Sequence, residues 1–145
     1  MSHEIRKATK KDINKMAQLM IKEFSKPPYN DKWTKKNSEK SINSDLTIGI
    51  GYIIKEKNNI IGFMLIRKDI LDKIYLFIEN LIVDGDYQGK GVGKMLIKFI
   101  EKKYSKNNKV IISLTTNKKS SAYNFYKKLG FRENKENINM SKEIK

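Results

Sequence analysis

The chain has 145 residues, which is enough for one domain with a real core and too few for two ordinary domains. It has no Cys and a single His, His3, so disulfides, thiolate metal sites and histidine-based triads are excluded, and no metal is expected. The net charge is +15. Because the cations are scattered and almost all Lys, nucleic acid is not expected as the main partner, although the positive field would attract small polyanions.

No apolar run approaches the length of a membrane span, and the N-terminus lacks the apolar segment of a signal peptide. We therefore expect a cytoplasmic protein without a membrane partner, as a monomer or a homodimer. The sequence has neither an internal repeat nor a linker, so residues 1–145 are predicted to form a single domain.

The N-terminal third predicts a strand, a helix and a polar segment. Glu4–Ala8 reads as a short first strand, and Thr9 with Asp12 forms a near capping box before a helix. The helix has an apolar face at Ile13, Met16, Ala17, Met20 and Phe24. Pro27-Pro28 ends it, and the Lys-rich stretch Tyr29–Asp45 is predicted to be a loop and a short helix.

The middle of the chain predicts three strands. Thr47–Lys57 alternates between apolar and polar residues, and Ile60–Lys68 follows a turn at Asn58-Asn59, which together predict a β-hairpin. Ile74–Val83 is the longest apolar run and predicts a strand that is buried on both faces.

The C-terminal third predicts two helices separated by a strand. The helices are Val92–Ser105 and Ser120–Leu129, the strand is Val110–Thr116, and Gly130 ends the second helix as a C′ glycine. Two closing strands are expected at Phe131–Glu133 and Asn137–Lys142. The order of elements predicts an α/β domain with a mixed sheet.

A glycine-rich loop separates the Ile74–Val83 strand from the helix that follows. A helix N-terminus offers unpaired N–H groups and partial positive charge, and glycines let a ligand approach the backbone, so this loop predicts an anion cradle. The P-loop pattern is absent, because Gln88 replaces its first glycine and Met95 its Ser/Thr. The dinucleotide pattern would need glycine at Lys94. The alternative interpretation is a flexible turn without a ligand.

Two motifs resemble the GNAT N-acetyltransferase superfamily. Gln88-x-x-Gly91-x-Gly93, after an L-x-V strand end, resembles its acetyl-CoA pyrophosphate loop, [QR]-x-x-G-x-[GA]. The segment Ala122–Phe131 resembles its A-x-x-[FL]-Y-x-x-x-G-F motif. With the order of elements, the resemblance covers essentially the whole chain. It implies a GNAT-type mixed, mostly antiparallel central sheet, flanked by about four helices and splayed after the fourth strand.

The resemblance also implies an activity and a donor site. An acetyl group would pass from acetyl-CoA to a primary amine of a small molecule, by direct attack in a ternary complex. Backbone groups of Leu81, Ile82 and Val83 would pair with the pantetheine arm. The pyrophosphate would be held by Gln88, Gly89, Lys90, Gly91, Val92, Gly93 and Lys94. Where the family often has a pantetheine-binding Asn, this chain has Lys119, so Asn117, Ser120 or Ser121 would supply that contact.

Two residues are the candidate catalytic groups. Tyr126, at the family's tyrosine position, would contact the cofactor and protonate the leaving thiolate; the alternative is a core aromatic. Glu79 interrupts the apolar strand and would be the base, directly or through a water; the alternative is a structural ion pair with one of the many Lys residues. Asn80, next along the strand, is expected to point to the opposite face.

Two other functions stay open from the sequence. One is a protein N-terminal or lysine acetyltransferase, whose site would be a groove open to an extended peptide. The other is a non-catalytic acyl-CoA-binding or nucleic-acid-associated module. The acceptor amine would be chosen by Tyr29–Asp45, the Asn58-Asn59 turn and the C-terminal strands, which carry no readable pattern.

Overall fold

The structure, a computed structural model, describes residues 2–145. Its contacts divide the chain into a first unit that ends at Thr115 and a second unit, Thr116–Lys145. The first unit holds the whole sheet and three of the helices, and the second holds the fourth helix and the C-terminal segment.

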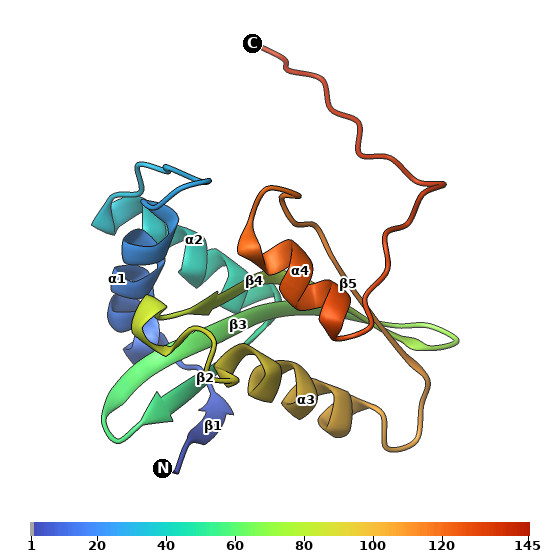
Figure 1. The fold of residues 1–145 in the computed structure, drawn as a ribbon, viewed down its shortest axis with the longest axis horizontal. Coiled ribbons are helices and arrows are strands. Elements are labelled where there is room, and N and C mark those ends of the chain that lie inside the picture. Colours follow the sequence, from blue (N-terminus) through green and yellow to red (C-terminus); the bar gives the residue numbers. More distant parts are fainter. Residues whose placement is uncertain (1) are drawn as a thin grey trace. The chain divides into compact units, whose positions relative to one another are not determined.

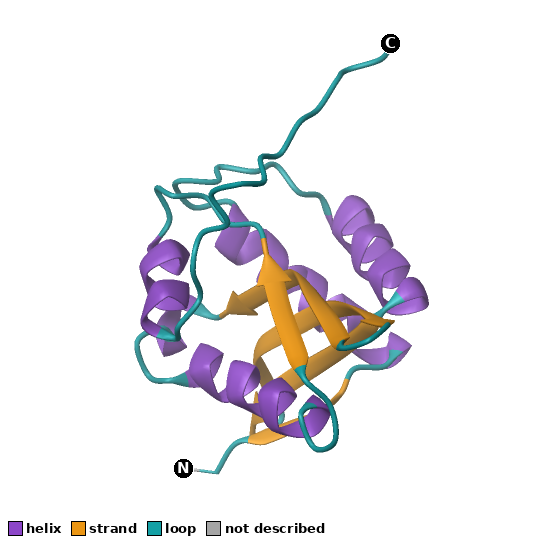
Figure 2. Ribbon diagram, turned by 90° about the vertical axis from the view of Figure 1, so that its right-hand side faces the viewer, coloured by secondary structure: helices purple, strands orange, loops and turns teal. Residues whose placement is uncertain are grey.

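The first unit is built on one sheet, drawn in orange in Figure 2. The sheet has five strands, which lie side by side in sequence order. β1 to β4 are antiparallel, whereas β5 runs parallel to β4. The strands are β1 Glu4–Lys7, β2 Ile50–Glu56, β3 Asn59–Ile70, β4 Ile74–Val83 and β5 Val110–Leu114. The predicted class, a mixed and mostly antiparallel sheet, is confirmed.

Helices cover both faces of this sheet (Figures 1 and 2). Residues 2–145 form α1 Ile13–Phe24, α2 Lys35–Ile48, α3 Val92–Tyr104 and, in the second unit, α4 Ser121–Lys128. The core shared with α1 and α2 contains Ile53 of β2. The next residue, Ile54, points the other way, and a Cβ added to Gly62 beside it would lie 3.2 Å from Ile54 and 3.4 Å from Val92 of α3. The helices α1 and α2 therefore pack on one face and α3 on the other.

The region before the hairpin differs from the prediction. Helix α2 has 14 residues, and it includes Thr47 and Ile48, which were predicted to open a strand. The Thr34 hydroxyl caps α2 by accepting a bond from the Asn37 N–H, and the Gly49 N–H closes its end on the Asp45 carbonyl. The apolar alternation thus crosses a helix–strand boundary. The hairpin turn falls on Lys57-Asn58, one residue earlier than predicted.

The predicted closing strands are wrong. In the described chain, residues 131–145 form neither helix nor strand. This segment is rich in Asn, Lys and Glu, and its apolar side chains Ile138 and Met140 are about 80% exposed (78% and 82%). Without burial of those side chains, a polar segment does not recover the entropy lost in forming a strand.

A β-bulge interrupts the pairing of β3 with β4. Leu65 pairs with Asn80 and the next residue, Ile66, pairs with Ile78, so Glu79 is the extra residue. The pairing of β4 with β5 ends at the same place, with Ile78 opposite Leu114. Strand β4 therefore leaves β5 at Glu79, which is the splay that was predicted.

The bulge also changes the direction of one side chain. Asn80 is paired with Leu65, which belongs to the α1–α2 core, and Glu79 meets Arg67 two residues further along β3. Both side chains are therefore on the α1–α2 face, and the expectation that Asn80 points away from Glu79 is wrong. Simple alternation fails wherever a bulge adds one residue.

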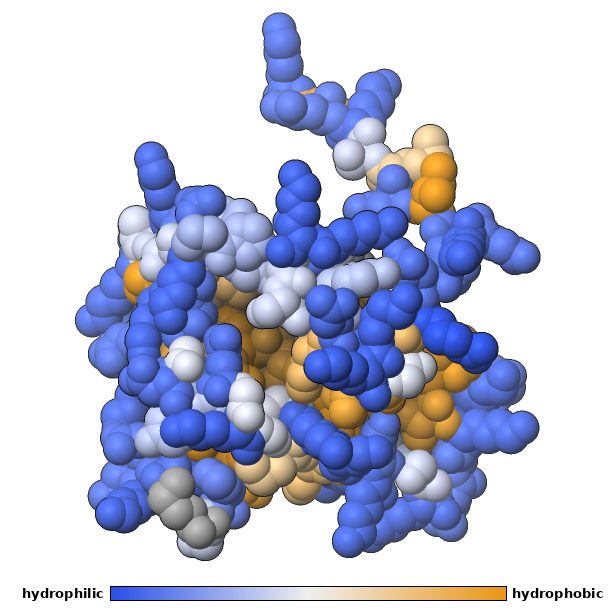
Figure 3. All heavy atoms as spheres, in the orientation of Figure 1, coloured by the Kyte–Doolittle hydropathy of each residue, from blue (hydrophilic) through white to orange (hydrophobic). Residues whose placement is uncertain are grey.

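The molecular surface is mostly hydrophilic on the face seen in Figure 3, as expected from 31 Lys and Arg residues. Within residues 2–145, none of the helices combines the length and the apolar character needed to cross a membrane.

Candidate functional site

The glycine-rich loop begins where β4 ends and continues into α3. A short 3-10 helix, Gly85–Tyr87, follows the strand, and the chain then passes Gly89 and Gly91 with φ of 77° and 83°. Other residues adopt this left-handed conformation only with strain. Gly91 is the N-cap of α3, and the first hydrogen bond of the helix runs from the Met95 N–H to the Gly91 carbonyl at 2.9 Å.

This loop has the features of an anion cradle. The N–H groups of Val92, Gly93 and Lys94 precede the first hydrogen bond of the helix and are not used within it. A Cβ built on Gly89 or Gly91 would meet no atom within 4 Å, so the space beside this backbone is open. The helix dipole adds partial positive charge. The site therefore fits a pyrophosphate group.

Two lysines add charge at the cradle. Lys90 and Lys94 are exposed, and the Lys90 ammonium lies 5.5 Å from the centroid of the Tyr87 ring, within cation–π range. Both side chains are placed on the loop and the first turn of α3, where they strengthen the attraction for a polyanion.

The strand end beside the cradle has one unpaired edge. Leu81, Ile82 and Val83 pair with β3, but among the described residues no β5 residue lies opposite them, because the β4–β5 ladder stops at Ile78. An edge of this kind can accept another extended chain with amide groups. This is the place that the sequence predicted for the pantetheine arm.

Glu79 lies at the bulge and is paired with Arg67 of β3. Its side chain is 23% exposed, and the Arg67 side chain is 53% exposed. A third charged group is close. Burial raises the pKa of Asp45, at the end of α2, the charge of Glu79 raises it further, and the charge of Arg67 lowers it. Two carboxylates therefore share the field of one guanidinium at the point where β4 leaves β5.

A small pocket of about 420 Å³ lies along α2, next to this cluster. It is lined by Trp33, Asn37, Lys40, Ser41, Ser44 and Asp45. Asp45 belongs to both the pocket and the charge cluster. The pocket is shallow and open to solvent.

The second unit carries the other predicted catalytic residue. Tyr126 contacts Phe125 and Phe131, with ring centroids 5.0 and 5.3 Å apart, in edge-to-face geometry. The Phe131 N–H bonds to the Tyr126 carbonyl and the Gly130 N–H to the Lys127 carbonyl, both at 3.1 Å, and Gly130 has φ of 94°. This pattern is a Schellman motif, in which a C″ residue packs on C3. The prediction that Gly130 ends the helix is confirmed.

The candidate pantetheine contacts of the second unit precede α4. The Asn117 side-chain oxygen accepts from the Lys119 N–H at 2.8 Å, and its carbonyl accepts from the Ser120 N–H and hydroxyl at 3.0 and 2.7 Å. Asn117 and Ser120 therefore build the turn that starts the helix. Ser121 is its first residue and is exposed.

The first unit brings together most of the predicted site. Glu79, Leu81–Val83 and the loop Gln88–Lys94 follow one another along β4 and into α3. Tyr126, Asn117 and Ser121 belong to the second unit.

Four charged residues were missed from sequence: Glu23, Lys26, Asp45 and Arg67. Burial of Glu23 could have been predicted, because this residue is three positions after Met20 and seven after Met16 and so lies within the apolar stripe of α1.

Comparisons with known proteins were consistent with one family. The acetyltransferase (GNAT) domain matches residues 10–142. No curated protein matches the sequence.

Three solved structures illustrate the fold. The "possible acetyltransferase from Clostridium difficile 630" is 18% identical with a TM-score of 0.83, and the match covers 100% of each chain. A Clostridium acetobutylicum protein described as a "predicted acetyltransferase with acetyl-CoA" is 20% identical with a TM-score of 0.71, covering 97% of this chain and 96% of that one. Glucosamine-6-phosphate N-acetyltransferase from Arabidopsis thaliana is 20% identical with a TM-score of 0.66, covering 100% of each chain.

Proposed function

Because the chain belongs to the acetyltransferase (GNAT) family, we propose that it transfers an acetyl group from acetyl-CoA to a primary amine of a small molecule. The observation that carries the proposal is the glycine-rich cradle at the start of α3, directly after the unpaired edge of β4. A pyrophosphate group fits the cradle, and the amides of the pantetheine arm fit the unpaired edge of β4. The N–H groups of the loop after Gln88, up to Lys94, would hold the pyrophosphate, and Leu81–Val83 would align the arm.

The reaction would be a direct transfer. The amine nitrogen attacks the thioester carbonyl carbon, the C–S bond breaks, and the thiolate takes a proton as the amine loses one. Holding both substrates in line lowers the barrier, and backbone N–H groups near Leu81–Val83 would stabilise the developing oxyanion. Glu79 would accept the amine proton, directly or through a water, and the Tyr126 hydroxyl would protonate the thiolate.

The acceptor would lie on the α2 side of Glu79. A small amine is supported by Asp45, a carboxylate that lines the open pocket along α2 together with Lys40. A protonated amine is attracted by two neighbouring carboxylates, and the amine must then lose its proton before attack. The same fold is known to act on a small amine, since one structural relative acetylates glucosamine-6-phosphate.

A panel of amines, assayed by release of free thiol from acetyl-CoA, tests this function. The panel includes amino sugars, aliphatic polyamines, free amino acids and lysine-containing peptides. We expect thiol release with at least one small amine and none with peptides. Turnover confined to peptides would instead indicate a protein acetyltransferase. Binding of acetyl-CoA without turnover for any amine, at saturating concentrations, would indicate a non-catalytic module.

A further inference from the structure

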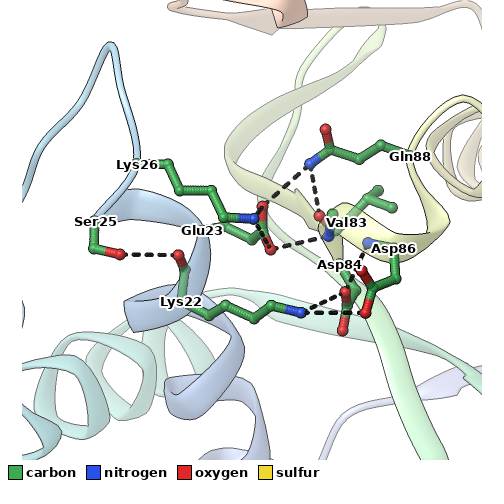
Figure 4. A network of polar contacts seen from close by, with 9 residues as sticks. Lys22, Glu23, Ser25, Lys26, Val83, Asp84, Asp86 and Gln88 are labelled. Atoms are coloured by element: carbon green, nitrogen blue, oxygen red, sulfur yellow. Dashed lines mark hydrogen bonds and ion pairs between the residues drawn. The ribbon is translucent and has the colours of Figure 1, made fainter.

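A buried carboxylate joins the end of α1 to the loop that follows β4 (Figure 4). Glu23 is only 8% exposed. Its two oxygens accept hydrogen bonds from the Lys26 ammonium, both at 3.1 Å, from the Gly85 N–H at 2.9 Å and from the Gln88 amide at 3.3 Å. Two of these donors belong to the loop, 62 and 65 residues further along the chain.

The loop is fitted closely to this carboxylate. A Cβ on Gly85 would come within 2.7 Å of the Lys26 ammonium and 3.4 Å of a Glu23 oxygen. A side chain at this position would displace the Lys26 ammonium, whereas the Glu23 oxygen would remain at ordinary contact distance. Lys26 also balances the charge of Glu23, so that the carboxylate adds little net negative charge next to a site for anions.

Gln88 links the Glu23 carboxylate to the cradle. Its side-chain amide, held by Glu23, also donates to the carbonyl of Val83 at 2.9 Å, and its own N–H reaches the Gly85 carbonyl at 3.4 Å. These bonds close the segment Val83–Gln88 into a compact loop. Gln88 is also the first residue of the Gln88-x-x-Gly91-x-Gly93 motif, so Glu23 and the Val83 carbonyl together hold the residue at which the cradle begins.

A second ion pair joins the same two elements at the surface. Lys22 donates to Asp84 at 2.7 Å and lies 3.7 Å from Asp86, and Asp84 accepts from the Asp86 N–H at 3.0 Å. The side-chain contacts of Lys22 run to Asp84 and Asp86, so this pair adds to the docking of α1 on the same loop.

We propose that Glu23 is a positioning residue for the acetyl donor, which rests on the proposed function of the glycine-rich loop. By holding Gly85 and Gln88, Glu23 keeps the loop in the conformation that receives the pyrophosphate before the donor arrives. Without this carboxylate the loop has to be ordered during binding, and part of the binding free energy is lost to that ordering.

The test measures the affinity of CoA by calorimetry in Glu23→Gln. A glutamine offers one acceptor oxygen and turns an NH₂ group toward Gly85 or Lys26, which are donors. We expect CoA to bind roughly tenfold more weakly, the size of one lost charge-assisted hydrogen bond. Gln88→Leu, which removes the amide that Glu23 holds, is expected to weaken CoA in the same way. If Glu23→Gln does not fold, Glu23→Asp replaces it, because the shorter carboxylate cannot hold both loop donors.

The control is Glu39→Gln, which makes the same change of charge on α2, where the carboxylate accepts from the Asn14 side chain at 3.2 Å and lies away from the loop. S-acetylpantetheine, which has the thioester arm and no pyrophosphate, separates positioning from general damage. The turnover of S-acetylpantetheine should be unchanged in Glu23→Gln. A merely structural defect would lower both this turnover and the affinity for CoA. Wild-type CoA affinity in folded Glu23→Gln and Gln88→Leu would overturn this inference alone. A wild-type protein without affinity for CoA would overturn the donor site as well.

Discussion

Glu79 has two charged neighbours, Arg67 and Asp45, and they decide how its role can be tested. Arg67 pairs with it, and Asp45 is near enough for its pKa to be raised by the charge of Glu79. The ion pair is a complete structural reason for a carboxylate in an apolar strand, and a base at the splay is a functional one. The two roles can be separated because Arg67 can be removed while the carboxylate is kept.

We predict that Glu79→Gln lowers turnover by about 10²-fold where the acceptor amine is mainly protonated, and by less as the pH rises and free amine becomes available. The measurement is a pH–rate profile with saturating acetyl-CoA. Arg67→Met breaks the same ion pair and should keep the shape of the wild-type profile. If the pH–rate profile of Glu79→Gln equals that of the wild type, the role of Glu79 is the structural ion pair and not that of a base.

Tyr126 has a structural role that the motif by itself does not reveal. Tyr126, Gly130 and Phe131 are three positions of one Schellman motif, so their spacing is explained by the ending of a helix. The ring satisfies this requirement, whereas the hydroxyl is not needed for it. A change that removes only the hydroxyl therefore tests the chemistry separately from the packing.

We predict that Tyr126→Phe lowers turnover by on the order of 10²-fold, a typical contribution of a general acid. The ring contacts with Phe125 and Phe131 remain, so thermal stability should change by about 1 kcal/mol or less. The affinity for CoA should also be unchanged, because the proton stabilises the negative charge that develops on sulfur in the transition state and not the bound ground state. Tyr123→Phe on the same helix is the control. Wild-type turnover in Tyr126→Phe, measured where chemistry limits the rate, would exclude the role.

At the scale of elements, the strand–loop–helix unit from β4 to α3 was the most predictable part of the fold. Ile74–Val83 was predicted to the residue, and the helix ended at Tyr104, one residue before the predicted Ser105. Apolar runs and glycines determine these elements locally. The closing strands were wrong because a strand depends on a distant partner. The bulge and the Glu23 network were not predicted, because both are set by pairings between residues far apart in sequence.

The N-terminus of α3 gives a prediction for the cradle. Gly91→Glu should abolish CoA binding, because a side chain there would enter the open space beside the backbone and add negative charge. It would also be strained at φ of 83°, so circular dichroism is needed to show that the variant is folded. Unchanged CoA affinity in a folded Gly91→Glu protein, measured by calorimetry, would show that the cradle does not hold the donor.

The connection of β1 to α1 gives a prediction for stability. Asp12 is 7% exposed and holds Arg6 through two bonds of 2.8 and 2.9 Å, while it accepts from the Thr9 N–H at 2.8 Å. The bond from Arg6 lowers the pKa of Asp12, against the opposing effect of burial. The ionised carboxylate therefore stabilises the fold above its unfolded pKa, and this stability is lost as the pH falls through the folded pKa.

Asp12→Asn should accordingly lower the free energy of unfolding by about 1.5–3 kcal/mol at pH 7, the range for hydrogen bonds to charged groups. The deficit should shrink at low pH, where the wild-type carboxyl is also protonated. Urea unfolding at pH 7 and near the lower limit of folding measures both values. An equal deficit at the two pH values would mean that packing, and not charge, is lost.

At the scale of the whole molecule, the family assignment covers residues 10–142 and so includes both compact units. That the two units form one domain stays a prediction. The charge of +15 is a property of the whole chain, and the substrate expected for it is a polyanion. Long-range attraction of this kind depends on salt, whereas the hydrogen bonds of the cradle depend on it much less.

We predict that the dissociation constant of CoA rises several-fold between low and high salt, where the Debye length falls from about 10 Å at 0.1 M to about 3 Å at 1 M. S-acetylpantetheine has no phosphate, and its kinetic parameters should be almost independent of salt over the same range. Equal salt dependence for both compounds would show that the salt acts on the protein and not on steering of the donor.

The bulge at Glu79 affects how the protein responds to the loss of a residue from β4. Ile78 and Ile82 are an even number of residues apart, yet Ile78 pairs with Ile66 while Ile82 lies opposite Phe63 in the α1–α2 core. Only the extra residue allows them to point to opposite faces. Deleting residue 79 would leave Ile78 and Ile82 an odd number of residues apart, so the pairing of β3 with β4 would become regular and Ile82 would stay opposite Phe63. The fold should therefore tolerate this deletion, which removes the Glu79 carboxylate without turning Asn80–Val83 over.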